Sequence, residues 1–160
     1  MYITGIDPTA DWTSEPEHAL GTLGMNMTDQ GTKGYRYVKL RNESASVSAV
    51  AGDMAAYLTS PANDEEANTV VTDNTNAATL PVGAGMIQTA VAGVANTAYY
   101  GWVQSDGYAV ANPTPSGATD GDALFVSGTD KLLANAAASD APVCAVTIDA
   151  SAKLIRLKCW

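Results

Sequence analysis

Hydrophobic and polar residues alternate along several short stretches of the chain, which is the pattern of β-strands rather than of helices. In residues 35–41, Val38 and Leu40 share one face with Arg36, while two tyrosines and a lysine take the other face. Residues 154–160 alternate apolar and basic side chains in the same way and end on a tryptophan. Further strands are expected at residues 54–59, 68–72, 86–94, 99–105, 108–110, 122–127, 131–133 and 143–149.

Turn residues separate these stretches. Asp106-Gly107 stands directly between residues 99–105 and 108–110, and Asp-Gly between two apolar strands is a strong signal for a hairpin. Residues 60–66 are polar, and we expect them to form a loop after the strand at 54–59. About nine or ten short strands at such close spacing predict an all-β fold, either an antiparallel β-sandwich or a small β-barrel.

Residues 1–33 differ from the rest because they show no periodicity and contain several glycines and two prolines. Acidic residues dominate this part, with Lys33 as its one basic side chain. It also holds more apolar residues than a disordered tail usually carries, Trp12 among them. We therefore expect an extended acidic N-terminal arm over residues 1–33, packed on its own domain or on a neighbour, and a single β-domain over residues 34–160.

Charge narrows the classes of partner. The net charge of -9 repels phosphate backbones and anionic lipid surfaces, so it disfavours nucleic acid and membranes, and it suits a basic protein surface. No apolar run approaches the ~20 residues that cross a bilayer. The N-terminal residues lack the basic and apolar regions of a signal peptide, so we expect a chain that matures in a cytoplasm.

Groups that carry catalysis are sparse. The single histidine, His18, stands in the acidic region without a nucleophile pattern around it, and the carboxylates are scattered. Asp120-Gly121-Asp122 has the start of a calcium loop, but Leu124 occupies the next ligand position. Cys144 and Cys159 are expected to be buried free thiols. We predict no enzyme, no metal and no cofactor.

Seven of the eight basic residues lie on two segments, the first strand of the β-domain with its flanks and the last strand. One interpretation is protection of exposed strand edges, where Lys and Arg are common. The other is that the two strands pair and form a basic face, which receives the acidic residues of a neighbouring copy.

Aromatic residues gather at Tyr99, Tyr100, Trp102 and Tyr108, around the predicted hairpin. They fill the core and stack across strands, or they form an interface hot spot, or they provide a platform for a sugar. Trp12 and the C-terminal Trp160 suit the anchoring of an interface.

A series of turn-and-strand motifs spans residues 34–149. It consists of Gly34-Tyr35-Arg36-Tyr37-Val38-Lys39-Leu40, Ala51-Gly52-Asp53, Ala92-Gly93-Val94, Tyr100-Gly101-Trp102-Val103-Gln104 with Gly107, Gly121-Asp122-Ala123-Leu124 and Ala141-Pro142-Val143-Cys144-Ala145-Val146. The series resembles the head decoration, or cement, proteins of tailed bacteriophages.

This resemblance implies a β-rich, β-tulip-like domain, usually trimeric, that binds the major capsid protein on the exterior of the virion after synthesis in the host cytoplasm. It implies no catalytic residues. Alternatives are a carbohydrate- or receptor-binding β-module of a virion, and another structural phage component such as a tail or head-completion protein. The residues expected at the capsid or subunit interface are Asp7, Asp11, Trp12, Glu15, Glu17, Tyr100, Trp102, Tyr108, Arg156, Lys158 and Trp160.

Overall fold

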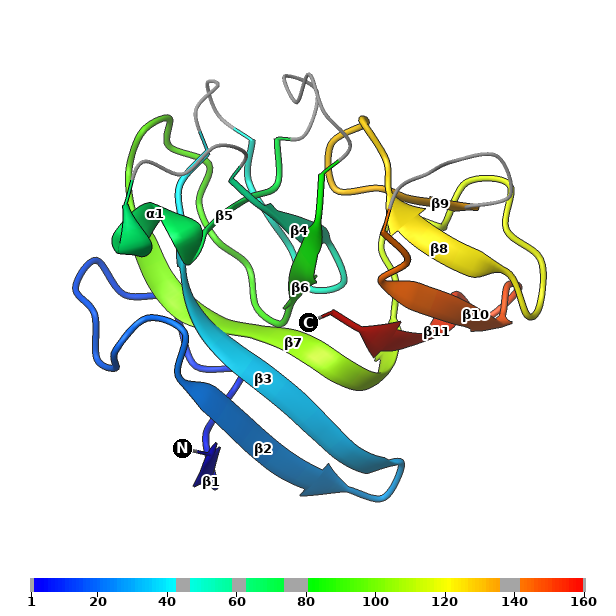
Figure 1. The fold of residues 1–160 in the computed structure, drawn as a ribbon, viewed down its shortest axis with the longest axis horizontal. Coiled ribbons are helices and arrows are strands. Elements are labelled where there is room, and N and C mark those ends of the chain that lie inside the picture. The colour runs from blue at the N-terminus through cyan, green and yellow to red at the C-terminus, as the bar shows by residue number, and fades with distance from the viewer. Residues whose placement is uncertain (1, 43–46, 59–62, 74–80, 136–141, 160) are drawn as a thin grey trace.

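The computed structural model describes residues 2–42, 47–58, 63–73, 81–135 and 142–159. Their regular secondary structure is almost entirely β-strand, which confirms the predicted all-β fold. Eleven strands form one mixed sheet, and a single helical turn is the only helix in these ranges (Figure 1). The elements are β1 (Tyr2–Thr4), β2 (Leu23–Thr28), β3 (Gly31–Leu40), β4 (Met54–Tyr57), α1 (Asp64–Ala67), β5 (Thr69–Val71), β6 (Gly83–Ile87), β7 (Tyr99–Val110), β8 (Ala123–Val126), β9 (Leu133–Asn135), β10 (Ala145–Asp149) and β11 (Leu154–Lys158).

Five strands close a ring. β3 pairs with β5, β5 with β4, β4 with β6 and β6 with β7, and β7 returns to β3. This ring corresponds to the small barrel among the predicted architectures. Most pairings are antiparallel, but β1–β2 and β3–β5 are parallel. We call the apolar interior of the ring the barrel core; it includes Val38, Leu40, Ala55, Val70, Ala84, Ile87 and Val103.

A second group of strands extends from β7 in the order β11, β10, β8 and β9 (Figure 1). Alternation in β11 buries Ile155 and Leu157 and exposes Arg156 and Lys158, as the sequence pattern predicts. The buried side chains meet residues from the outer side of β4 and β6 in a second apolar cluster, the outer core. It includes Met54, Met86, Leu124, Leu133, Cys144, Ile155, Leu157 and Cys159.

Strand β7 belongs to both parts of the molecule, and it corrects the predicted hairpin. Asp106 and Gly107 do not form a turn, since the strand continues through them to Val110. Asp106 pairs with Gly34 of β3 on one edge of β7 and with Lys158 of β11 on the other. The backbone groups at this point therefore pair with neighbouring strands, whereas in a hairpin the two halves of the segment would pair with each other. Gly107 has a φ of 92° and packs against β3, where an added Cβ would lie 2.9 Å from the carbonyl oxygen of Thr32. The glycine here permits close strand approach rather than chain reversal.

The predicted boundary between arm and domain falls inside a strand. β2 and β3 form an antiparallel hairpin from Leu23↔Arg36 to Thr28↔Gly31, and β1 adds to the other edge of β2. The N-terminal part of the chain is therefore continuous with the sheet and packs on its own domain. Apart from the two-residue turn between β2 and β3, the described residues outside the strands of this region are 5–22; we call them the lead-in segment.

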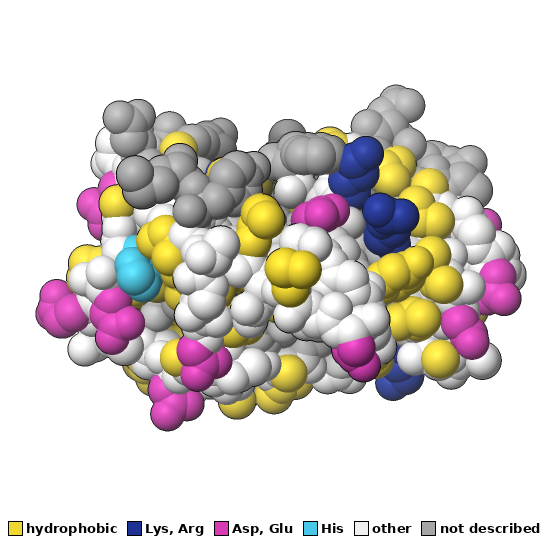
Figure 2. Space-filling model, turned by 90° about the horizontal axis from the view of Figure 1, so that it is seen from below, with side chains coloured by type: hydrophobic (Ala, Val, Ile, Leu, Met, Phe, Trp, Pro, Cys, Tyr) yellow, Lys and Arg dark blue, Asp and Glu magenta, His cyan; other side chains and the backbone are white. Residues whose placement is uncertain are grey.

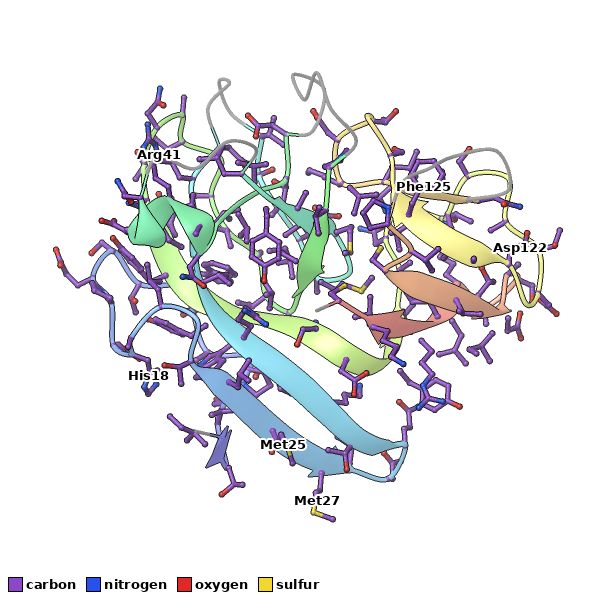
Figure 3. The ribbon with its side chains drawn as sticks, in the orientation of Figure 1. His18, Met25, Met27, Arg41, Asp122 and Phe125 are labelled. Carbon is purple, nitrogen blue, oxygen red and sulfur yellow. The ribbon has the colours of Figure 1, made fainter. Side chains whose placement is uncertain are left out.

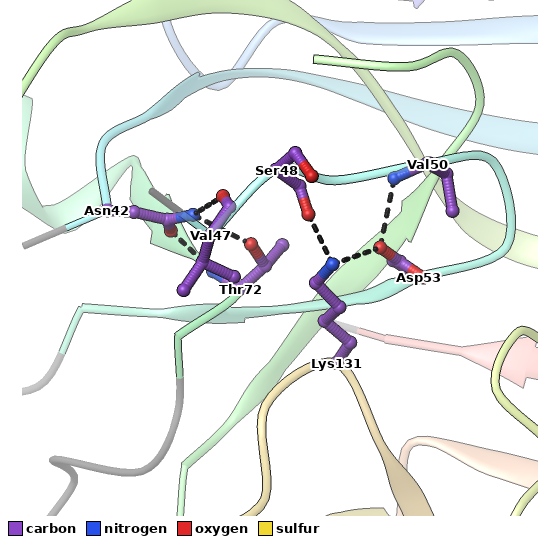
Figure 4. Close-up of polar contacts among 7 residues, drawn as sticks. All are labelled: Asn42, Val47, Ser48, Val50, Asp53, Thr72 and Lys131. Atoms are coloured by element: carbon purple, nitrogen blue, oxygen red, sulfur yellow. Dashed lines mark hydrogen bonds and ion pairs between the residues drawn. The ribbon is translucent and has the colours of Figure 1, made fainter. Parts of the chain in front are cut away.

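Polar contacts connect the barrel to the β8–β9 region (Figure 4). The carboxylate of Asp53, 2% exposed, accepts a hydrogen bond from the Val50 N–H at 2.9 Å and lies 3.3 Å from Nζ of Lys131. Lys131 Nζ also donates to the carbonyl of Ser48. These contacts stabilise the approach of residue 131 to the start of β4, where the Met54 N–H donates to the Lys131 carbonyl.

Helix α1 lies in the region predicted as a polar loop. Asn63 caps it, because its side-chain oxygen accepts a hydrogen bond from the Glu66 N–H at 2.9 Å. Among the described residues, no helix has the length and apolarity to cross a membrane.

Candidate functional site

A cavity of about 290 Å³ lies between the lead-in segment and the outer face of the β3–β7 pair. Residues from the lead-in segment and β1 form one side, and Tyr37 of β3 with Tyr100, Gly101 and Trp102 of β7 forms the other. In Figure 1 this part of the chain loops beside β1, β3 and the beginning of β7. We call this space the lead-in cavity.

Aromatic rings form the wall of the lead-in cavity. Tyr37 and Trp102 are direct cross-strand partners, and their ring centroids lie 5.1 Å apart at an interplanar angle of 66°. His18 lies against both, 5.1 Å from the Tyr37 ring and 5.3 Å from the Trp102 ring. Figure 3 shows His18 beside the start of β2. The two contacts of Tyr37 are edge-to-face and the His18–Trp102 contact is tilted. Such arrangements are favourable for aromatic pairs and fix the three rings relative to one another.

The lead-in segment is held on β7 by backbone pairing and by Trp12. Thr13 and Tyr100 exchange two backbone hydrogen bonds, of 3.0 and 2.8 Å, so the segment adds a short bridge to the free edge of β7. Trp12 is half-buried and packs against the barrel core. The Glu17 N–H donates to the Tyr37 hydroxyl at 3.0 Å. These contacts place the acidic side chains of the segment on a fixed backbone.

Four carboxylates of this segment point outward, since Asp7, Asp11, Glu15 and Glu17 are all exposed. Asp7 accepts hydrogen bonds from the hydroxyl and the N–H of Thr9, at 2.7 and 2.9 Å, and the Thr9 hydroxyl is the main cause that lowers the pKa of Asp7. Within the described ranges, no residue donates to the other three carboxylates. Figure 2 shows acidic side chains around the histidine at one end of the molecule.

Five of the predicted interface residues thus meet at one cavity: Asp7, Asp11, Glu17, Tyr100 and Trp102. Trp12 anchors the segment nearby, and Glu15 is exposed beside it. Trp102 is only 7% exposed, so most of its ring is wall rather than free surface. Sequence reasoning missed His18 and Tyr37 as site residues. The alternation in residues 35–41 did place Tyr37 on the face opposite Val38, but nothing local indicates that His18 folds back onto that face.

Tyr108, Arg156 and Lys158 lie on a different surface, the outward face of β7, β11, β10 and β8. Arg156 pairs with Tyr108 on one side and with Val146 on the other. Val110, Val146 and Ile148 are exposed on the same strands. In Figure 2, Lys and Arg side chains lie among hydrophobic ones in the half of the molecule away from the histidine. Trp160 is outside the described residues.

The suggestion that the first and last strands of the β-domain pair into one basic face is wrong. β7 lies between β3 and β11 and pairs with each of them on opposite edges. Lys39, on β3, forms an ion pair of 2.6 Å with Glu65 of α1. The basic residues of β3 and β11 therefore lie in different environments and do not form one face.

The structure also bears on the predicted metal and cysteine chemistry. Among the residues that the structure describes, no group of three or more His, Cys, Asp or Glu side chains is placed to hold a metal ion. Asp122 instead accepts hydrogen bonds from Thr119 and from the Asn135 side chain. Cys144 and Cys159 are buried free cysteines, as predicted.

Comparison of the chain with protein-family models, with curated proteins and with solved structures gave no match. The fold and the cavity define a small all-β protein with an aromatic-walled, acid-rimmed cavity.

Proposed function

We propose that this protein is a structural virion protein that binds the outer surface of a phage capsid and stabilises the shell by bridging neighbouring capsid subunits. One observation carries the proposal. The lead-in segment is fixed to the barrel by Trp12 and by the Thr13–Tyr100 bridge, and it presents four carboxylates to solvent. A fixed acidic surface suits docking onto a basic protein surface, because the side chains need little ordering on binding.

The partner is the major capsid protein, and the protein acts as a homo-oligomer, a trimer by resemblance to decoration proteins. Several copies in one oligomer explain how weak individual contacts give strong binding to the capsid. Each copy needs only a modest interface, because several contacts held in one oligomer bind with a higher effective concentration than any one alone.

Binding to purified expanded capsids tests the proposal. Cosedimentation should show the wild-type protein in the capsid pellet, and analytical ultracentrifugation of the free protein gives its oligomeric state. Reversing charge at Asp11, Glu15 and Glu17 to Lys should abolish the pelleting, whereas Asp29→Lys, which changes an exposed carboxylate in the β2–β3 turn, should not. Wild-type protein that stays in the supernatant at every salt concentration contradicts the proposal.

Substitution is a cleaner test than truncation. Removing residues 1–31 would delete β2 and Trp12, and with them the cover of Tyr37 and the packing on the barrel core. Loss of binding by such a fragment would report loss of folded structure as much as loss of contact. The exposed carboxylates of Asp11, Glu15 and Glu17 have no such structural role among the described residues.

A second candidate function is carbohydrate binding, and the aromatic wall of the lead-in cavity favours it. Carboxylates beside Tyr100 and Trp102 could accept hydrogen bonds from sugar hydroxyls while a ring packs on the sugar face. A glycan array tests this with Tyr100→Ala as the control, since Tyr100 is half-buried and its loss disturbs the wall less than that of the buried Trp102.

A further inference from the structure

The lead-in cavity has three features that together indicate the chemistry of its occupant. The first is its size. At about 290 Å³ it lies at the lower limit of the ~300–1,000 Å³ typical of small-molecule sites. Such a volume suits a single side chain or one small ring rather than an extended ligand.

The second feature is the wall. The rings of Tyr37, Trp102 and Tyr100 line the cavity, and the first two are fixed by their contacts with each other and with His18. The faces of Trp and Tyr rings carry negative electrostatic potential and attract cations, alkylammonium and guanidinium groups above all. Because these rings are already packed, a ligand would not have to order them.

The third feature is the set of polar groups without partners. Asp11 and Glu17 are among the residues that line the cavity, and their side chains are exposed at its rim. No Lys or Arg is among its described lining residues, and none of the described residues donates to either carboxylate. Tyr37 is 2% exposed, and its hydroxyl oxygen accepts one hydrogen bond, from the Glu17 N–H. A phenol oxygen has a second lone pair and a proton, and no described residue occupies either.

We infer that the lead-in cavity receives the cationic side chain of a Lys or Arg residue of the partner protein. The aliphatic stem packs on the aromatic wall, and the cationic head lies between the carboxylates of Asp11 and Glu17, within reach of the Tyr37 hydroxyl. This inference rests on the proposed function, because it identifies the contact by which the acidic surface engages a basic partner. It also predicts that the isolated protein binds small cationic molecules, which capsid binding alone does not require.

The test titrates the isolated protein with blocked amino acids and follows its backbone amide and indole N–H resonances by two-dimensional NMR. The probes are N-acetyl-lysine methylamide and N-acetyl-arginine methylamide. Their neutral counterparts, the norleucine and citrulline derivatives, have similar shape and no charge. We expect the cationic probes to shift the Trp102 indole and Gly101 amide resonances at millimolar concentrations, and the neutral probes to shift them much less.

Matched variants give the second arm of the test. Asp11→Asn and Glu17→Gln should each weaken binding of the cationic probes about two- to five-fold, which is the usual range for one exposed ion pair. Asp29→Asn makes the same change of net charge in the β2–β3 turn and should leave binding unchanged. All three side chains are exposed, so the variants should fold as the wild type does.

Equal shifts by cationic and neutral probes, or no shifts by either, would overturn the inference. So would shifts at Trp102 caused by N-acetylglucosamine alone, which would make the cavity a sugar site. Failure of the proposed function is seen separately: if the cationic probes bind as expected and the protein does not cosediment with capsids, the cavity assignment stands and its partner is another basic protein.

Discussion

The indole of Trp12 lies directly against Gly101, at the point where β7 passes under the lead-in segment. A Cβ atom added to Gly101 would be 2.6 Å from Cδ2 of the indole and 2.9 Å from Cε2. Gly101 is not among the residues with a positive φ, so a glycine is needed here for space and not for backbone conformation. The contact joins the segment that holds the carboxylates to the strand that holds Tyr100 and Trp102.

Gly101→Ala should therefore displace Trp12 and loosen the lead-in segment. We expect a loss of about 1–3 kcal/mol in the free energy of unfolding, as for other overpacked sites, and faster amide exchange in residues 7–18. Urea denaturation and hydrogen–deuterium exchange measure the two effects. Gly128→Ala is the matched control, because a Cβ there meets nothing within 4 Å. Unchanged exchange in the Gly101 variant would show that the packing is not needed to hold the segment.

The Asp53–Lys131 ion pair should contribute more to the free energy of unfolding than the Lys39–Glu65 pair, although its N···O distance is longer, 3.3 Å against 2.6 Å. Lys131→Met leaves a carboxylate that is 2% exposed and that, among the described residues, keeps only the Val50 N–H as partner. We expect a loss of about 1–3 kcal/mol. Lys39→Met removes a partner from Glu65, whose side chain is 57% exposed, and should cost less than about 1 kcal/mol. Thermal or urea unfolding of both variants gives the comparison, and equal losses would contradict it.

Both cysteine thiols should be unreactive in the folded protein. The Cys159 thiol donates to the Cys144 carbonyl at 3.6 Å, and its contact with the Cys144 thiol together with burial raises the pKa of Cys159 well above its usual range. Little Cys159 thiolate, the reactive form, is then present at pH 8. Cys144 is buried, which keeps the reagent from its thiol. Mass spectrometry should show slow labelling by iodoacetamide in buffer and rapid labelling in guanidinium chloride. An Asp29→Cys variant supplies an exposed thiol as reference; equal labelling rates at all three positions would refute the prediction.

Stability should decline at alkaline pH because of two tyrosines. Burial raises the pKa of Tyr35, and burial raises the pKa of Tyr57 against the opposing effect of the Arg36 charge. A group whose pKa is higher in the folded state contributes stability that is complete below its unfolded pKa, near 10, and that is lost as the pH rises through the folded pKa. Urea unfolding between pH 8.5 and 11 measures the decline. Tyr57→Phe removes one ionising group and should flatten it; an unchanged slope in this variant would assign the decline to other residues.

Side-chain alternation identified about half of the strands, because period-two burial is a local property of the sequence, and it did not indicate β1 or β2. It placed the strands now seen as β3, β4, β8, β10 and β11 to within a few residues. It failed at Asp106-Gly107, where the fate of the turn residues depends on strands β3 and β11 that pair on either side. The local preference of Asp-Gly for a turn contains no information about distant strands that form hydrogen bonds with the same backbone.

The candidate site was only partly predictable for a similar reason. Acidic residues and aromatic residues were each recognisable as groups, but their meeting at one cavity depends on the lead-in segment folding back onto β3 and β7. His18 was missed because its neighbours in sequence, Glu17 and Ala19, form no recognisable motif, whereas its neighbours in space are Tyr37 and Trp102. The separation of Arg156 and Lys158 from this cavity likewise follows from strand order and not from composition.

The closure of the ring by β3 and β7 also bears on how quickly the chain can fold. These strands are far apart in the sequence, and β4, β5 and β6 lie between them. The chain must lose the entropy of closing a long loop before this pairing returns any energy, and all-β topologies of this kind commonly fold in milliseconds to seconds. Until β7 pairs with β3, an edge of β3 and the apolar side chains of the barrel core remain exposed and can associate with other chains. A cell that makes many copies at once would therefore meet its greatest risk of aggregation before the ring closes.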